Sequence, residues 1–129
     1  MTDAKNKHVL VVDDAALVRA YYRQALETAG YKVDEALNGL EALEKVLLHP
    51  FDLLIVDVNM PQMDGMTFLR TLREKEPPVS ATPAMVVSTE AGPQDRSTAR
   101  AAGANYYAVK PLKQAALTEL VDMLCGAVA

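Results

Sequence analysis

Short runs of apolar residues alternate along the chain with longer segments in which apolar residues recur at helical spacing. The runs cover residues 8–12, 32–36, 52–56, 84–88 and 105–109. This alternation predicts a βα unit repeated five times. Because crossovers between parallel strands are right-handed, the units predict a parallel sheet with helices on both faces. All strands of such a sheet end at one edge, and ligands bind at that edge.

The segments between the runs carry signals for the ends of the helices. Helices are expected over residues 15–29, 38–49, 65–75 and 93–103, and from about residue 113 to the C-terminus. Gly30 is expected to end the first helix, Asn38 is a candidate N-cap of the second, and Pro93 begins the fourth. The core-facing stripe of the first helix is expected to consist of Leu17, Val18, Tyr21, Ala25 and Ala29.

Composition narrows the class of protein. Of the 129 residues, 50% are hydrophobic and 23% are charged, so the chain can bury the core of one globular domain. No apolar stretch approaches the roughly 18 residues that span a bilayer, and the start has no apolar signal core, so a cytoplasmic location is expected. The five units use up the chain, and no output domain is expected.

Charge and metal-binding residue types exclude other classes. A net charge of −4 argues against nucleic-acid binding, because phosphate backbones are bound by clustered lysine and arginine. The single cysteine, Cys125, cannot form an internal disulfide, and with two histidines no zinc cluster is expected. An acidic protein of this kind suits a hard divalent cation.

Four of the apolar runs end abruptly in polar residues. Asp13 and Asp14 follow the first run, Asp57 follows the third, Ser88 ends the fourth and Lys110 follows the fifth. The predicted fold brings these ends together, so three carboxylates, a hydroxyl and an ammonium group share one site. Two carboxylates about 5 Å apart repel by roughly 3 kcal/mol at an effective dielectric near 20, so a cation should lie among them.

The residue types at these strand ends suit Mg²⁺ and phosphoryl transfer. Oxygen ligands with room for water favour Mg²⁺, whereas Zn²⁺ prefers histidine and cysteine. With the negative charge neutralised, Asp57 can attack phosphorus and form an acyl phosphate, while Lys110 and the Ser88 hydroxyl stabilise the transferred group. Taken singly, Asp14 could be only a helix N-cap, Ser88 a turn residue and Lys110 a solvated charge. Their joint placement favours phosphoryl transfer.

Four motifs occur in order at these strand ends, namely VVDD, DVNMPQMDG, VVSTEAG and VKPL. With them the chain resembles, from His8 to about Leu124, the response-regulator receiver family of two-component phosphorelay systems, especially its stand-alone CheY-like chemotaxis members. The resemblance implies a flavodoxin-like, CheY-like (βα)5 fold of the α/β class, doubly wound, with strand order 2-1-3-4-5. It also implies one receiver domain over residues 1–129.

The resemblance implies a role for each residue of the site. Asp57 would be the phosphoacceptor, Ser88 the switch hydroxyl and Lys110 the lysine that precedes a proline. The Mg²⁺ shell would consist of the side chains of Asp13, Asp14 and Asp57 and the backbone carbonyl of Asn59. Asn59 and Glu90 lie two residues beyond Asp57 and Ser88, where receivers tune the access of hydrolytic water, so fast self-dephosphorylation is expected.

Three more positions follow from the resemblance. Tyr107 falls where receivers carry an aromatic switch residue, which would turn inward when Ser88 moves toward phosphorylated Asp57. The alternative is a tyrosine simply packed on an edge strand. The Lys110–Pro111 bond is a candidate cis peptide. Gly65 fits a turn position that needs a positive φ.

The fifth helix has a wider apolar surface than packing on a sheet requires. Besides its core stripe, Leu120, Met123 and Ala127 extend the apolar sector to roughly 200°. We hypothesise that the fourth helix, fifth strand and fifth helix form a docking face for a partner or for a second copy of the chain. The alternative is a helix covered by the chain's own termini.

These features predict a signalling switch that assists its own phosphorylation and dephosphorylation, not an enzyme that turns over a separate substrate. A histidine kinase or phosphotransfer protein would supply the phosphoryl group, and the switch would change the affinity for a downstream target such as a flagellar motor switch or another relay protein. A homodimer that forms on phosphorylation is left open, and no nucleic-acid or membrane partner is expected.

Other proteins on similar folds are rivals to this interpretation. A flavodoxin-like redox protein would need a hydroxyl-rich phosphate loop where Asp13 and Asp14 stand. A phosphatase with an aspartate nucleophile would need a second acid where Asn59 stands. An adaptor that is never phosphorylated would usually lack part of the acidic site, which is complete in this sequence.

Overall fold

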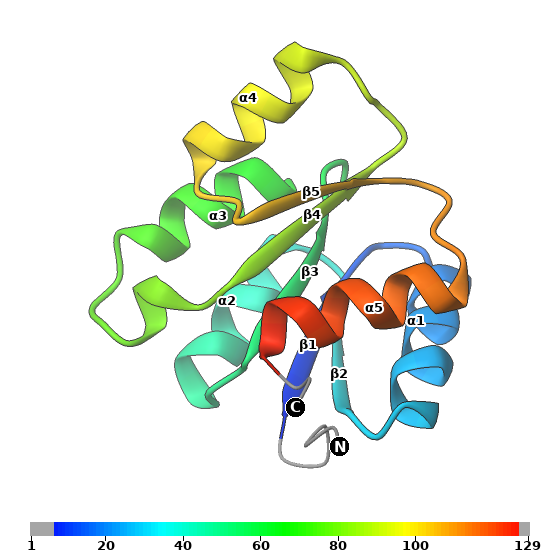
Figure 1. The fold of residues 1–129 in the computed structure, drawn as a ribbon. Coiled ribbons are helices and arrows are strands. Elements are labelled where there is room, and N and C mark those ends of the chain that lie inside the picture. The colour runs from blue at the N-terminus through cyan, green and yellow to red at the C-terminus, as the bar shows by residue number, and fades with distance from the viewer. Residues whose placement is uncertain (1–6, 127–129) are drawn as a thin grey trace.

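The computed structural model describes residues 7–126 and is built on one parallel sheet in the order β2-β1-β3-β4-β5 (Figure 1). Its strands are β1 (His8–Val12), β2 (Lys32–Ala36), β3 (Leu53–Asp57), β4 (Ala84–Ser88) and β5 (Tyr106–Val109). Its helices are α1 (Ala16–Thr28), α2 (Gly39–Leu48), α3 (Gly65–Arg73), α4 (Pro93–Ala102) and α5 (Gln114–Cys125), with a short 3-10 helix η2 (Val79–Ala81). The predicted (βα)5 fold and its strand order are confirmed.

The sheet separates two apolar cores, because successive side chains of a strand point to opposite faces. In β1, Val9 and Val11 face a core that α1 and α5 cover, whereas Leu10 and Val12 face a core that α2, α3 and α4 cover. Figure 1 shows α1 and α5 together on one side of the sheet. These four side chains of β1 are fully buried. Strands buried on both faces need continuous apolar runs, which explains the sequence pattern.

Two strands begin one residue later than the apolar runs predict. Before β3, the Asp52 amide donates to the His8 carbonyl and its carboxylate accepts from the His8 amide, both at 2.8 Å. Before β5, Asn105 pairs with Ala84 in the same way, through its amide and its side-chain oxygen, again at 2.8 Å. In both places a side-chain oxygen replaces the carbonyl of a regular ladder, so the strand starts one residue further on.

Three of the five residues of the stripe predicted for the first helix, Val18, Ala25 and Ala29, lie at the core, whereas the other two do not. Tyr22 and Leu26 are buried, whereas Leu17 is 86% exposed and Tyr21 is 41% exposed. The prediction that Leu17 and Tyr21 face the core is therefore wrong. The Tyr21 hydroxyl instead donates to the main-chain carbonyl of Leu112 at 2.6 Å, which places this side of α1 over the loop between β5 and α5.

The helix ends follow the predicted capping. Asn38 Oδ1 accepts from the Glu41 amide at 2.9 Å and so caps α2. Gly30 follows α1 with a φ of 101°, a conformation that favours glycine. Pro93 is the first residue of α4. Within residues 7–126, no helix is both long enough and apolar enough to cross a bilayer.

Candidate functional site

Three carboxylates gather at the carboxyl ends of β1 and β3. Asp13 and Asp14 follow β1, and Asp57 is the last residue of β3. Carboxylate oxygens of the three residues lie within 4.8 Å of one another. Asp13 is 2% exposed, Asp57 is half-buried and Asp14 is exposed. The structure therefore brings the three predicted acids together, and solvent reaches the cluster at Asp14.

Lys110 joins the acids from the end of β5. Its ammonium nitrogen lies 3.1 Å from Asp57 Oδ1 and 3.4 Å from Asp13 Oδ2. Its main-chain amide donates to the Ser88 carbonyl at 2.7 Å, which fixes the end of β5 to the end of β4. Lys110 is thus a paired cation, and the alternative of a solvated charge is wrong. The Lys110–Pro111 peptide is cis, as the resemblance implied.

The cluster keeps an excess of negative charge. Burial raises the pKa of Asp57, the hydrogen bond from Lys110 opposes that effect, and the charge of Asp13 raises the pKa further. Burial lowers the pKa of Lys110, but its hydrogen bond with Asp57 and the charge of Asp13 outweigh burial and raise it. One ammonium group therefore leaves three carboxylates incompletely neutralised. Their hard oxygen donors, joined by no histidine or cysteine of residues 7–126, fit Mg²⁺ better than Zn²⁺.

Main-chain contacts direct the two acids that follow β1. The Asp13 amide donates to the Ala36 carbonyl at 3.1 Å, and Asp13 Oδ1 accepts from the Ala15 amide at 2.8 Å. Ala15, not Asp14, occupies the N-cap position of α1, and no side chain of the described residues caps this helix. The alternative of Asp14 as an N-cap is therefore wrong, and its carboxylate is available to the cluster.

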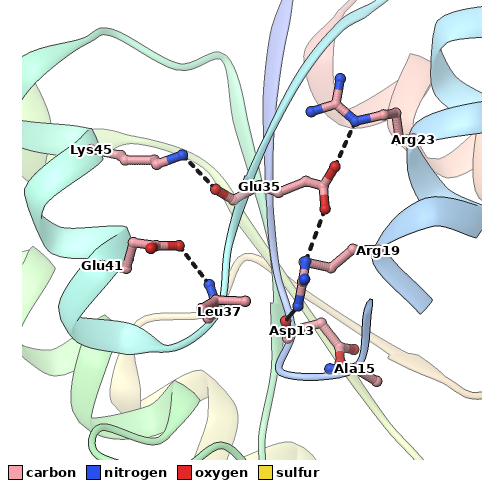
Figure 2. Close-up of polar contacts among 8 residues, drawn as sticks. All are labelled: Asp13, Ala15, Arg19, Arg23, Glu35, Leu37, Glu41 and Lys45. Carbon is pink, nitrogen blue, oxygen red and sulfur yellow. Dashed lines mark hydrogen bonds and ion pairs between the residues drawn. The ribbon is translucent and has the colours of Figure 1, made fainter. Parts of the chain in front are cut away.

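The sequence interpretation missed two arginines of α1 beside this turn, one of which contacts it directly (Figure 2). Arg19 of α1 donates to the Asp13 carbonyl at 2.7 Å and to Glu35 Oε1 of β2 at 2.8 Å. Arg23, one helical turn further, donates to the other oxygen of Glu35 at 2.6 Å. The spacing of the two arginines was a usable signal for a shared partner. The identity of that partner, on the next strand, cannot be read from local spacing.

Gly65 begins α3 against the end of β3. It is not among the described residues with a positive φ, so the predicted reason for glycine is wrong. A Cβ atom at this position would lie 2.2 Å from the carbonyl oxygen of Asp57 and 3.0 Å from Val56 Cγ1. The position needs glycine because the backbone of α3 approaches the main chain of Asp57 closely.

A series of hydrogen bonds leads from the site toward α4. Ser88 is buried at the end of β4, and its Oγ accepts from the Glu90 amide at 3.1 Å. Such a bond is typical of a turn and leaves open the predicted role of Ser88 as the switch hydroxyl. The Tyr107 hydroxyl donates to the Glu90 carbonyl at 2.7 Å, and the Arg96 guanidinium lies 5.2 Å from the centre of the Tyr107 ring. Asn59 and Glu90 are exposed, and Glu90 is not a member of the acidic cluster.

The predicted docking residues of α5 do not share one environment. Met123 is 57% exposed, whereas Leu120 is half-buried and packs against the core beneath the helix. Ala127 lies outside the described residues. The neighbouring surface is hollowed by a pocket of about 230 Å³ between α4 and β5, which Arg96, Arg100 and Tyr107 help to line.

Comparisons with known proteins agree with this geometry. The sequence model of the response regulator receiver domain matches residues 9–122. The chain is 37% identical over 122 residues to the gliding motility regulatory protein of Myxococcus xanthus and 38% identical over 111 residues to the transcriptional regulatory protein ResD of Bacillus subtilis (strain 168). These alignments cover 94% and 86% of this chain, but it spans only 16% and 45% of those relatives' lengths. The structure is similar to the chemotaxis protein CheY4 of Vibrio cholerae, with a TM-score of 0.85 and 34% identity over 92% of this chain and 98% of that one.

Proposed function

The chain belongs to the response regulator receiver domain family, and from this premise we propose that it is a two-component signalling switch phosphorylated on Asp57. One observation carries the proposal. Carboxylate oxygens of Asp13, Asp14 and Asp57 meet within 4.8 Å, and Lys110 lies 3.1 Å from Asp57. A carboxylate nucleophile needs a cation to reduce the charge around it and a fixed ammonium group to balance the incoming phosphoryl group.

The side chains of Asp13, Asp14 and Asp57, with the backbone carbonyl of Asn59, would hold Mg²⁺. The chemistry of the donors supports this ligand set, because carboxylates in a partly open pocket leave room for water and phosphate oxygens. When bound, Mg²⁺ supplies positive charge that offsets the repulsion between the acids and the phosphoryl oxygens. The buried Asp13 and the exposed Asp14 would then bind from the first strand and Asp57 from the third.

In the proposed transfer, a carboxylate oxygen of Asp57 attacks phosphorus on a phosphohistidine of a histidine kinase or phosphotransfer protein. The O–P bond forms as the N–P bond breaks, and the electron pair of the N–P bond returns to the imidazole nitrogen. Lys110 pairs with the charge on the transferred group. In hydrolysis, water attacks phosphorus, the O–P bond breaks with its electron pair left on Asp57, and inorganic phosphate leaves.

Ser88 and Tyr107 are proposed to carry the signal away from Asp57. Ser88 Oγ accepts from the Glu90 amide at 3.1 Å and still has its own hydrogen to donate to a phosphoryl oxygen. The Glu90 carbonyl is also the hydrogen-bond partner of the Tyr107 hydroxyl, at 2.7 Å. A shift of Ser88 toward Asp57 would therefore move the segment that anchors Tyr107 and change the surface between α4 and β5.

Asn59 and Glu90 are proposed to set the lifetime of the phosphoryl group. Both side chains are exposed, and each lies two residues beyond a proposed site residue, Asp57 or Ser88. Polar side chains at these positions can admit and orient a hydrolytic water. We expect the phosphorylated protein to decay quickly in Mg²⁺ buffer, and persistence for many hours would contradict this role.

The proposed docking face combines α4, β5 and α5. Met123 offers the most exposed apolar side chain of the predicted set, the half-buried Leu120 offers less, and Ala127 remains a prediction. The partner would be a downstream target in the cytoplasm, such as a flagellar motor switch or another relay protein, or a second phosphorylated copy. The names of two relatives, a gliding motility regulator and a chemotaxis protein, favour an output in motility.

Phosphorylation by a small donor tests the central proposal. After incubation with acetyl phosphate and Mg²⁺, the intact mass of the protein is expected to show one phosphate adduct, and EDTA should suppress it. Asp57→Asn should abolish the adduct, while the control Asp52→Asn, just before the first residue of β3, should retain it. An unmodified wild-type protein, or an adduct that persists in Asp57→Asn, would contradict the proposal.

A further inference from the structure

A charged network joins α1 and β2 to the turn that carries Asp13 and Asp14 (Figure 2). Each carboxylate oxygen of Glu35 accepts one hydrogen bond, Oε1 from Arg19 Nε at 2.8 Å and Oε2 from Arg23 Nε at 2.6 Å. Arg19 makes a further contact, from Nη1 to the main-chain carbonyl of Asp13 at 2.7 Å. Its side chain is 11% exposed, against 35% for Arg23. Within residues 7–126, Arg19 alone of the two arginines links Glu35 to the acidic turn.

The carbonyl that Arg19 contacts belongs to the peptide unit between Asp13 and Asp14. Asp13 is held independently of Arg19, by its amide bond to the Ala36 carbonyl and by the bond from the Ala15 amide to its carboxylate. Asp14 is exposed, so its carboxylate is positioned chiefly by the main chain that carries it. The contact from Arg19 therefore orients the peptide plane from which the exposed member of the acidic cluster departs.

Glu35 is itself fixed by the sheet and by α2. It lies in β2, which pairs in parallel with β1, and stands opposite Val11 in the register. Its main-chain carbonyl accepts from the Lys45 ammonium of α2 at 2.6 Å, as Figure 2 shows. The main chain of Glu35 is thus held by β1 and α2, and its carboxylate binds Arg19, which contacts the turn.

The charge of Arg19 and its contacts predict opposite effects on Mg²⁺ binding when this side chain is removed. A guanidinium beside the acidic turn repels a divalent cation, so on charge alone its removal would strengthen Mg²⁺ binding. Glu35 offsets that charge, because the hydrogen bond from Arg23, and then that from Arg19, lowers the pKa of Glu35 against the opposing effect of burial. If Arg19 acts by holding the turn, its removal must instead weaken binding.

We propose that Arg19 is a positioning residue, which holds the peptide between Asp13 and Asp14 so that both carboxylates face Asp57, and that Glu35 orients Arg19 for this task. The inference rests on the proposed function in taking Mg²⁺ as the ion that the acids bind. It extends the site beyond its oxygen ligands to a side chain of α1 and a side chain of β2.

Calorimetric titration of the full, unphosphorylated chain with MgCl₂ tests the proposal. Arg19→Gln and Arg19→Lys are both expected to raise the dissociation constant for Mg²⁺ about tenfold. Lysine keeps the charge but lacks the planar fork that reaches Glu35 and the Asp13 carbonyl together. The matched control is Arg23→Gln. This change removes a hydrogen bond to the same Glu35 carboxylate but leaves the contact between Arg19 and Asp13 in place, so the variant should bind Mg²⁺ nearly as well as the wild-type protein. Unchanged binding by Arg19→Lys, or tighter binding by Arg19→Gln, would overturn the proposal.

A charge-balanced pair of changes gives a second, independent test. Arg19→Gln combined with Glu35→Gln removes one positive and one negative charge, so a purely electrostatic role predicts no change in Mg²⁺ affinity. The positioning role predicts the same weakening, about tenfold, as in Arg19→Gln alone. Circular dichroism in EDTA should show that these variants are folded. A wild-type dissociation constant for the double variant would refute the positioning role.

Phosphorylation kinetics separate positioning from catalysis. With acetyl phosphate as donor, the Mg²⁺ concentration that gives half the maximal rate should rise in Arg19→Lys, while the rate at saturating Mg²⁺ should approach that of the wild-type protein. A lower rate at saturating Mg²⁺ with unchanged half-saturation would contradict the proposal. If the wild-type protein itself binds no Mg²⁺, the proposed function fails; if it binds Mg²⁺ and both Arg19 variants match it, only this inference fails.

Discussion

The carboxyl end of the sheet and the surface between α4 and β5 differ in how tightly their atoms are held. At the sheet end, Asp13 is 2% exposed, Lys110 is bonded to two acids, and α3 leaves no room for a Cβ atom at Gly65. Between α4 and β5 lies a pocket of about 230 Å³, where the half-buried Tyr107 packs on the core, its hydroxyl makes one hydrogen bond and its ring face makes one contact with Arg96. Tight packing holds the reacting groups of the acidic site in one geometry. A surface with fewer contacts can change conformation at a small cost in free energy, as a switch requires.

The largest effect is expected where crowding is greatest. Gly65→Ala would place a methyl group 2.2 Å from the carbonyl oxygen of Asp57, and because both atoms belong to main-chain segments neither can move freely. We expect a loss of about 3 kcal/mol in the free energy of unfolding, measured by urea denaturation. The control is Gly126→Ala, where φ is 65° but, apart from the neighbouring residues of the chain, nothing within residues 7–126 lies within 4 Å of the added atom, and the expected loss is about 1 kcal/mol. Equal losses in the two variants would contradict the crowding.

The next effect concerns the ammonium group that the site holds in place. Lys110→Ala removes the cation 3.1 Å from Asp57, and we expect the rate of phosphorylation by acetyl phosphate to fall about 100-fold. Lys113 is a suitable control, because it is exposed at the start of α5 and its replacement by alanine should leave the rate nearly unchanged. A wild-type rate in Lys110→Ala would show that Lys110 has only a structural role.

A third effect follows from the raised pKa of Asp57. Burial is the main cause of the rise, the hydrogen bond from Lys110 opposes it, and the charge of Asp13 adds to it. A raised pKa means that the folded state binds this proton more tightly than the unfolded chain does. The resulting stability is complete below the ordinary pKa, about 3.9, and is lost as pH rises through the raised value. At neutral pH without metal, ionised Asp57 is therefore a net cost to folding.

Asp57→Asn should remove that cost. We expect the variant to be more stable than the wild-type protein at pH 7 in EDTA, by on the order of 1 kcal/mol in urea denaturation. The gain should shrink as pH falls below about 4, and also when Mg²⁺ is added at pH 7, because the ion stabilises the wild-type protein. The control Glu44→Gln, on the exposed side of α2, should show no such pH-dependent gain. Lower stability of Asp57→Asn at pH 7 would mean that the bond to Lys110 outweighs burial.

The carboxyl end of the sheet is also the part of the structure that the sequence predicts best. Asp13, Asp57, Ser88 and Lys110 were predictable as neighbours, because each ends an apolar run and the topology of a parallel sheet brings such ends together. The resemblance to the family rested on motifs that contain these residues, and both the family and the strand order that the resemblance implied are confirmed. Contacts at this end of the sheet depend on where each apolar run ends and on the order of strands and helices along the chain. Both can be read directly from the sequence.

Two kinds of feature were not predictable in this way: the rotation of a helix about its axis, and contacts that a long side chain makes with another element. Leu17 and Tyr21 have a helical spacing from Ala25 that suits a core stripe, yet α1 is rotated so that Tyr22 and Leu26 are buried instead. Both candidate stripes of α1 contain large apolar residues, so hydrophobic spacing alone cannot choose between them. The partnership of Arg19 with Glu35 crosses from a helix to a neighbouring strand, and only the packed structure reveals it.

The smallest expected effect lies on the loosely held surface. The Arg96 guanidinium is 5.2 Å from the centre of the Tyr107 ring, a contact worth about 0.5–1 kcal/mol at an exposed site. In a double-mutant cycle with Arg96→Gln and Tyr107→Leu, urea denaturation should give a coupling energy of about 0.5 kcal/mol. The matched cycle uses Arg100→Gln, one helical turn further along the same pocket, and should give a coupling near zero because Arg100 has no such contact with the ring among the described residues. If Arg96 and Tyr107 instead couple by several kcal/mol, this surface is as firmly held as the acidic site, and a change at Ser88 could not reorganise it at small cost.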